Sequence, residues 1–309
     1  MSLGLSQSHV VADGQSLWNF MVSWGECARG HADITLPPIH ERERLALQGP
    51  PSEEEAEKLA AAFQLKCVEE VKDDRKEEAA VESPAGEAGA LMQCVFDMPA
   101  SCIKELKAEA GGSFTTYEVV SAHFWQRVNE ARRLPAGALI GFTVLANLRS
   151  KLNPPLPSSY FGNVVHFGVA KTWAGNLRHD NLAKIAERIH EAILGCNQDS
   201  LLLVMHWLEL HGNRFLELAH TWIDIIQVNV ASSPRFPAYK VDFGWGCPSA
   251  VRLPKVPGNG EMVLFGGRPG SADGDMEICL ALPSPVMKRL LNDPSFLGKP
   301  ISSPLRYYE

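Results

Sequence analysis

The sequence predicts an α+β protein in which mixed sheets carry flanking helices. Runs that alternate like strands are interspersed with segments whose apolar residues recur at helical spacing, and no strict βα repeat connects them. This irregular order argues against a doubly wound parallel sheet. The 309 residues are 45% hydrophobic, which is enough for one large core or two smaller ones.

A strand and a helix are expected at the start of the chain. Residues 3–12 alternate and then become apolar, which predicts a buried strand, and Asp13-Gly14 predicts a turn. Apolar residues then recur at helical spacing up to about Gly30; they are Leu17, Phe20, Met21 and Trp24. Because a strand this close to Met1 needs a neighbouring strand, we expect the chain to begin inside a domain.

The remaining elements divide the chain into three parts. Ser52 and Glu55 form a capping-box pattern. Residues 69–90 have the composition of a mobile, charged linker, and a solvated helix is the alternative. Strands are predicted at 91–98, 139–147 and 163–170, helices at 99–110, 116–133, 180–195, 199–218 and 285–292, and short strands with Gly/Pro turns after Asp224. The predicted parts are a domain remnant (1–50), a crossover linker (51–90) and a more complete domain (91–309).

Composition excludes several classes of partner. The net charge of −7 argues against nucleic acid or an anionic membrane as the main partner, so an anionic ligand would need a local basic patch. No apolar run reaches membrane-spanning length. The seven cysteines contain no C-x-x-C pair, which indicates free thiols in a reducing cytoplasm.

His9 is the first candidate for chemistry. It is predicted at a strand end before the tight turn of Asp13 and Gly14, where an imidazole can reach a cleft and a carboxylate can fix the loop or orient the base. The motif alone is weak, and a buried, hydrogen-bonded core histidine is the usual alternative. A second match, His220 to Asp224, lacks the following glycine and lies in an apolar run, so we interpret it as chance.

The pentapeptide Asp242-Phe243-Gly244-Trp245-Gly246 is a far more specific pattern. Glycine permits positive φ angles and close approach of the backbone, and the tryptophan is expected to anchor the turn in a core. These properties predict a structural role rather than a catalytic one.

Together these motifs resemble the plant BAHD acyl-CoA-dependent acyltransferase family. H-x-x-x-D-G stands early and D-F-G-W-G late. Ala146–Pro155 resembles the family's N-x-R-S-x-x-x-P-P stretch, Tyr160-Phe161-Gly162-Asn163 matches Y-F-G-N, and Ser232–Pro237 resembles one lineage of plant members. The likeness spans nearly the whole chain but only about two-thirds of a usual member, whose long N-terminal segment is absent here.

The resemblance implies the chloramphenicol acetyltransferase-like fold with an incomplete N-terminal domain. It implies that His9 acts as general base, that Asp13 and Gly14 form its supporting turn, and that Arg149 pairs with Asp13. It also implies binding of acyl-CoA near Tyr160, Phe161, Gly162 and Asn163, and a monomer when full length. The implied small-molecule acceptor offers a hydroxyl or amine and is a plant specialised metabolite or a lipid-like molecule. No metal, permanent cofactor or acyl-enzyme is implied.

Several alternatives carry less weight. Asp242-Phe243-Gly244 matches a kinase triplet without the other kinase motifs, and Gly4–Ser8 lacks the last glycine of a nucleophile elbow. His9 and Asp13 have no third metal ligand at a suggestive spacing. Gly266–Gly270 could cradle a phosphate, although a hairpin loop is more usual for such a cluster. A non-catalytic remnant of such an enzyme remains the main rival.

Overall fold

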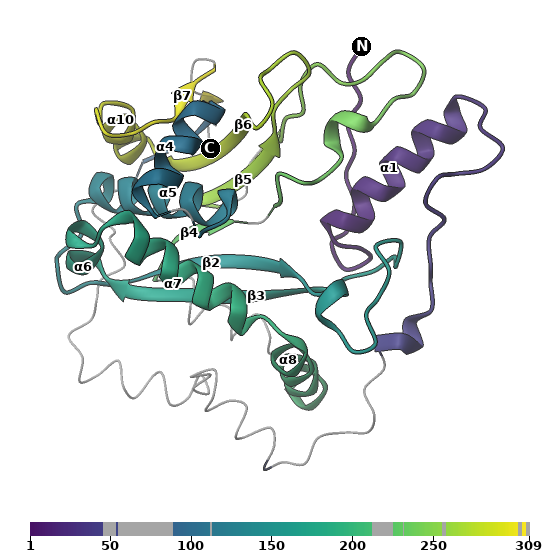
Figure 1. Ribbon diagram of the computed structural model, residues 1–309, viewed down its shortest axis with the longest axis horizontal. Coiled ribbons are helices and arrows are strands. Elements are labelled where there is room, and N and C mark those ends of the chain that lie inside the picture. The colour runs from purple at the N-terminus through teal and green to yellow at the C-terminus, as the bar shows by residue number, and fades with distance from the viewer. Residues whose placement is uncertain are drawn as a thin grey trace.

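A mixed eight-stranded sheet is the centre of the fold (Figure 1). The computed structural model describes residues 1–45, 54, 89–111, 113–211, 225–230, 232–254, 258–301 and 305–306. Across the sheet the order is β3 (Val165–Trp173), β2 (Leu139–Asn147), β4 (Ile226–Val230), β5 (Glu261–Gly266), β6 (Met276–Pro283), β1 (Leu91–Met98) and β7 (Lys299–Pro300), with β8 (Leu305–Arg306) also on β1. Among the described strands only β2–β4 and β4–β5 pair in parallel, so the predicted mixed sheet is confirmed.

Helices cover one face of this sheet (Figure 1). They are α4 (Ala100–Glu109), α5 (Thr116–Arg132), α6 (Ala174–His179), α7 (Leu182–Gly195) and α10 (Ser284–Leu291), and α8 (Gln198–His211) follows α7. The long helix α5 begins with a capping box, in which Thr115 and Glu118 satisfy each other's backbone N–H groups. Trp125 of α5 is fully buried, with its ring 5.4 Å from that of Phe142 on β2. This main core therefore lies between α5 and the sheet.

Part of the opposite face of the sheet is covered by helix α1 (Gly14–Ala28) and by segment 232–254, most of which is irregular. Val95, Val263, Phe265 and Cys279 alternate with residues of the main core, as the two-residue period of a strand requires. Trp18 of α1 and part of segment 232–254 pack against them. Segment 232–254 thus connects the sheet to α1.

Helix α1 (Gly14–Ala28) lies beside this segment and begins at an Asp13 cap. Two of its glycines permit close approach: a Cβ on Gly14 would come within 2.8 Å of the Phe236 ring, and one on Gly25 within 2.4 Å of the Asp242 carbonyl oxygen. Glycine is therefore needed where the helix backbone touches the loop. Among the described residues, no helix has the length and apolar composition needed to cross a bilayer.

Five local predictions need correction or fall, wholly or in part, outside the described residues. The strand predicted for residues 3–12 is wrong: the segment is irregular with a turn at 9–11, and residues 1–11 are exposed. A strand needs a hydrogen-bonded neighbour, and none of the described strands pairs with this segment. Strand β3 begins at Val165 rather than 163. The Ser52–Glu55 capping box, linker residues 69–88 and residues 212–218 of the predicted 199–218 helix lie outside the described part of the chain.

Candidate active site

The candidate base, His9, lies on an exposed turn immediately before α1. The Val11 N–H donates to the Ser8 carbonyl at 3.1 Å, which closes the turn. Gln7 Nε2 donates to the Ala12 carbonyl at 3.2 Å and reinforces it. Within the described residues no side chain is hydrogen-bonded to the His9 ring, and His9 is exposed. The imidazole is therefore available for proton transfer in the geometry seen here.

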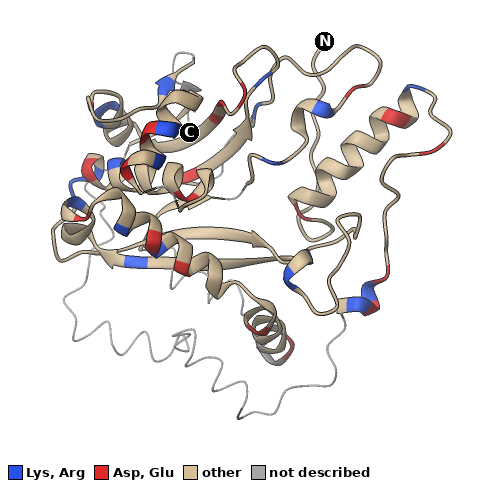
Figure 2. Ribbon diagram, in the orientation of Figure 1, with Lys and Arg blue, Asp and Glu red and all other residues tan. Residues whose placement is uncertain are grey.

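Asp13 and Arg149 form a buried, bidentate ion pair beneath this turn. Arg149 Nη1 lies 2.7 Å from Asp13 Oδ2, and Nη2 lies 3.0 Å from Oδ1, although 136 residues separate the two in sequence. Their side chains are 1% and 3% exposed. The ion pair expected from the resemblance is present, and it joins the start of α1 to η3 (Arg149–Lys151), which lies beside the N-terminal end of α1 (Figure 2).

The Asp13 carboxylate is fully occupied by this structural role. Oδ1 also accepts the Ser16 N–H at 2.9 Å, and Oδ2 accepts the Val164 N–H at 3.0 Å. Burial acts to raise the pKa of Asp13, but hydrogen bonds from Arg149 and these backbone groups outweigh it and hold the pKa below 3.8. A carboxylate accepts about four hydrogen bonds, so none is left for the His9 imidazole. Asp13 therefore fixes the loop and does not orient the base by direct contact.

The Y-F-G-N segment contacts the same loop. Asn163 Nδ2 donates to the carbonyls of His9 at 2.8 Å and Val10 at 3.1 Å. The Gly162 carbonyl accepts from Arg149 Nη2 at 3.0 Å, and that of Tyr160 accepts from the same nitrogen at 3.1 Å. These contacts hold the turn and the ion pair together. The acyl-CoA role expected for this segment stays a prediction.

Phe161, the remaining residue of that segment, lies against the chain that follows α1. Its ring packs edge-on against His40, with centroids 5.4 Å apart, and its N–H donates to the Ile39 carbonyl at 2.9 Å. Ile39 also forms an isolated parallel bridge with Tyr160. The chain that follows α1 therefore packs on the Y-F-G-N segment, and that segment in turn contacts the His9 turn through Asn163.

Two supporting residues escaped the sequence reasoning. Ser16 is buried, and its hydroxyl oxygen lies 3.1 Å from the Gly162 N–H and 3.0 Å from Arg149 Nη2, both of which donate to it. Asn147 Oδ1 accepts from the Arg149 backbone N–H at 3.0 Å and from Nη1 at 3.1 Å. The position of Ser16 three residues after an Asp cap could have identified it, since the N3 residue faces the cap.

The D-F-G-W-G segment forms the expected turn and packs on the other end of α1. Asp242 Oδ1 accepts the N–H groups of Gly244 at 2.8 Å and Gly246 at 3.0 Å, and the first of these bonds is the main cause that lowers the pKa of Asp242. Both glycines have positive φ, 99° and 89°. The Arg29 guanidinium donates to the Asp242 carbonyl and so ties the C-terminal end of α1 to the turn.

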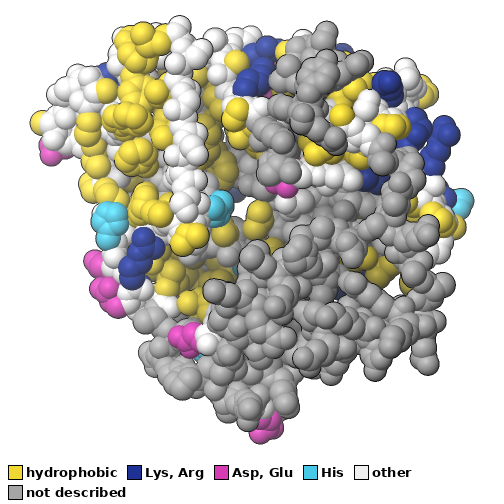
Figure 3. All heavy atoms as spheres, turned by 180° about the vertical axis from the view of Figure 1, so that it is seen from behind, with side chains coloured by type: hydrophobic (Ala, Val, Ile, Leu, Met, Phe, Trp, Pro, Cys, Tyr) yellow, Lys and Arg dark blue, Asp and Glu magenta, His cyan; other side chains and the backbone are white. Residues whose placement is uncertain are grey.

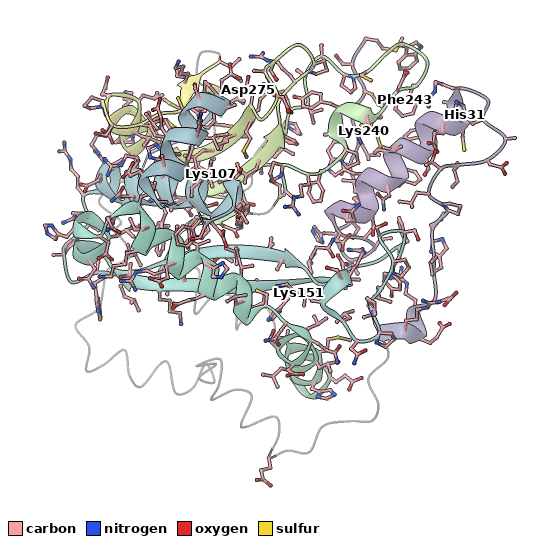
Figure 4. All side chains as sticks on the ribbon, viewed as in Figure 1. His31, Lys107, Lys151, Lys240, Phe243 and Asp275 are labelled. Carbon is pink, nitrogen blue, oxygen red and sulfur yellow. The ribbon has the colours of Figure 1, made fainter. Side chains whose placement is uncertain are left out.

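The predicted burial of Trp245 is wrong, because its side chain is 65% exposed. The aromatic residue that joins the turn to α1 is Phe243, which lies beside the C-terminal end of the helix (Figure 4) and packs edge-on against Trp24 at 5.2 Å. Gly25 contacts Asp242 eleven residues after Gly14, so about 17 Å of helix axis separates this turn from the His9 end. The turn therefore lies at the end of α1 away from His9, and its structural role stays a prediction.

Hydrophobic side chains gather on the back of the molecule over the part that carries α1 (Figure 3). Phe20 and Trp24 are 48% and 41% exposed.

In the part of the chain that the structure describes, no cluster of three His, Cys, Asp or Glu side chains is placed to hold a metal ion.

The sequence is similar to a known family of proteins and to several of its characterised members. The sequence profile described as the Transferase family matches residues 1–297. BAHD acyltransferase DCR of Arabidopsis thaliana is 28% identical over 306 residues, covering 96% of this chain and 60% of that protein. Shikimate O-hydroxycinnamoyltransferase of Nicotiana tabacum is 29% identical over 256 residues, covering 80% and 56%. The chain thus spans about 60% of the length of these relatives.

Solved structures show the same fold. Vinorine synthase matches with a TM-score of 0.66 at 19% identity, over 95% of this chain and 62% of that one. F. graminearum TRI101, complexed with coenzyme A and T-2 mycotoxin, matches with a TM-score of 0.69 at 16% identity, over 94% and 65%. The expected CoA-dependent acyltransferase fold is therefore confirmed, and the chain belongs to the Transferase family, that of the BAHD acyltransferases.

Proposed function

We propose that the whole protein transfers an acyl group from acyl-CoA to a hydroxyl or amine of a small molecule, with His9 as general base. The observation that carries the proposal is an exposed imidazole on a turn that is fixed by the buried Asp13–Arg149 pair. An exposed base on a rigid support can meet a substrate proton without rearranging. Buried charges with all their hydrogen bonds made resist such rearrangement.

The reaction follows from these roles. His9 takes the proton of the acceptor, whose oxygen or nitrogen attacks the thioester carbonyl and forms a tetrahedral intermediate. That intermediate collapses, the carbon–sulfur bond breaks, and the proton on His9 passes to the departing thiolate of CoA. The acyl group moves directly between substrates, so no residue of this chain is acylated. Asp13 and Arg149 keep the turn in place throughout.

Relatives support both kinds of acceptor without selecting one. Those at 28–29% identity include a shikimate O-hydroxycinnamoyltransferase and an anthranilate N-benzoyltransferase. F. graminearum TRI101 was crystallised with coenzyme A. We carry over to this protein only the shared chemistry: an acyl-CoA donor and a nucleophilic small molecule.

The proposal also covers the organisation of the protein. Residues 1–50 form part of an N-terminal catalytic domain, 51–90 a crossover and 91–309 the second domain. The whole protein acts as a monomer in the cytoplasm. Free thiols at the six described cysteines, two of them exposed, fit a reducing compartment.

The test is a panel assay on the whole protein. Acetyl-, benzoyl-, p-coumaroyl- and long-chain acyl-CoA donors are offered with alcohol and amine acceptors, and products are identified by mass spectrometry. CoA is quantified by chromatography, because the exposed Cys27 and Cys247 would consume a thiol reagent. Release of CoA that requires an acceptor and yields an acylated product supports the proposal. A burst of one CoA per enzyme without acceptor, or no transfer with any pair, contradicts it.

A further inference from the structure

The Asn163 carboxamide makes both of its donor contacts to the turn that carries His9. We propose that Asn163 is a positioning residue: it fixes the His9 turn, and thereby the reach of the imidazole, rather than binding acyl-CoA. This inference rests on the proposed function, because it concerns the same base. It also departs from the acyl-CoA role that the family resemblance implies for the segment.

The chemistry of the contact fixes the orientation of the amide. Nδ2 lies 2.8 Å from the His9 carbonyl oxygen and 3.1 Å from that of Val10. Both neighbours accept, so only the NH2 group can face them, and its two hydrogens serve the two carbonyls. Asn163 therefore has no side-chain N–H left for a phosphate or a pantetheine carbonyl.

The position of Asn163 is itself fixed by the buried ion pair. The next residue, Val164, donates its N–H to Asp13 Oδ2 at 3.0 Å. The preceding carbonyl, of Gly162, accepts from Arg149 Nη2 at 3.0 Å. Both peptide groups that flank Asn163 are thus held by the pair. The side-chain amide of Asn163 connects this rigid support to the exposed turn.

The turn needs such a support. Residues 1–11 are exposed, and the turn has one internal backbone hydrogen bond, from Val11 to Ser8. Misplacement of a catalytic group by about 1 Å can cost about 10²-fold in rate. Loss of the Asn163 contact should therefore lower kcat and leave the affinity for CoA unchanged.

The experiment compares Asn163→Ala and Asn163→Asp in the whole protein with Asn292→Ala. Asn292 is a matched control, because it is also exposed and its Nδ2 donates to one backbone carbonyl, that of Lys288, at 2.8 Å. Asn163→Asp is the more severe change, since its carboxylate faces two carbonyl oxygens without a proton to donate. The measurements are kcat with the donor–acceptor pair that the panel identifies, the Kd of CoA by calorimetry, and hydrogen exchange over residues 8–13.

We expect kcat to fall about 10-fold for Asn163→Ala and about 10²-fold for Asn163→Asp, with the Kd of CoA within twofold and faster exchange at Val11. Asn292→Ala should change none of these. A higher Kd for CoA with normal kcat and normal exchange would overturn the proposal, and so would unchanged kcat in both variants. An active His9→Ala protein would refute the proposed function instead, and the exchange measurement distinguishes the two failures because it needs no turnover.

Discussion

Replacement of Asp13 by asparagine tests the buried ion pair. The substitution preserves shape but exchanges one carboxylate oxygen for an NH2 group. Each oxygen accepts one Arg149 N–H and one backbone N–H, at 2.7–3.0 Å. Whichever way the amide turns, donors face donors, and the 3%-exposed guanidinium loses its counter-charge. Breaking a buried pair in this way costs about 3–5 kcal/mol of unfolding free energy.

Urea unfolding of the whole protein, followed by tryptophan fluorescence, measures this loss. The matched control is Glu41→Gln, which removes the ion pair of Glu41 with Arg44, whose side chains are 50% and 44% exposed. A solvent-exposed pair contributes about 0–1 kcal/mol, so this variant should resemble the wild type. The double variant Asp13→Asn/Arg149→Met should lose less than the sum of the two single losses. A loss below about 1 kcal/mol for Asp13→Asn would refute the reasoning.

The pH dependence of stability gives a second measure of the same pair. The folded-state pKa of Asp13 lies below 3.8, so its contribution is complete above that value and is lost as the pH falls through the lowered pKa. Wild-type stability should therefore fall more steeply below about pH 4 than that of Asp13→Asn. Urea midpoints at pH 7, 5, 4 and 3 make the comparison, and parallel curves would contradict it.

Two further variants test the packing of α1 and its loop. Gly25→Ala would place a Cβ 2.4 Å from the Asp242 carbonyl oxygen, so we expect a net loss of about 1–2 kcal/mol after the gain in helix propensity. In Gly195→Ala, where the helix faces open space, stability should stay equal or rise. Trp245→Ala should lower the free energy of unfolding by about 1 kcal/mol or less, because the side chain is 65% exposed. Trp125 is fully buried, so Trp125→Ala should lower it by about 3–5 kcal/mol. Chemical unfolding measures all four, and equal losses for the two tryptophans would show that exposure has been misjudged.

Sequence patterns predicted local elements and motifs better than they predicted which distant residues contact one another. Helical spacing predicted α4, α5 and α10 closely, since this signal is local. The pairing of Asp13 with Arg149 came from the family resemblance, because no local rule connects residues 136 positions apart.

The two wrong predictions, the strand at 3–12 and the burial of Trp245, both concern contacts with residues distant in sequence. Alternation in residues 3–12 predicted a strand, but a strand exists only where another strand pairs with it. The two glycines of D-F-G-W-G correctly predicted the turn, since positive φ is a backbone property. Which aromatic residue packs depends on the neighbouring surface, and here Phe243 rather than Trp245 contacts α1. The Asn163 contact likewise became visible only once the turn was placed.

The most direct test of the central claim is kcat for His9→Ala in the whole protein, measured beside His31→Ala. His31 is also exposed but follows the opposite end of α1 (Figure 4). If His9 is the general base, kcat should fall by at least about 10²-fold while the urea midpoint stays at the wild-type value, because the ring makes no hydrogen bond within the described residues. His31→Ala should retain full activity. A stable His9→Ala protein with wild-type kcat would contradict the account.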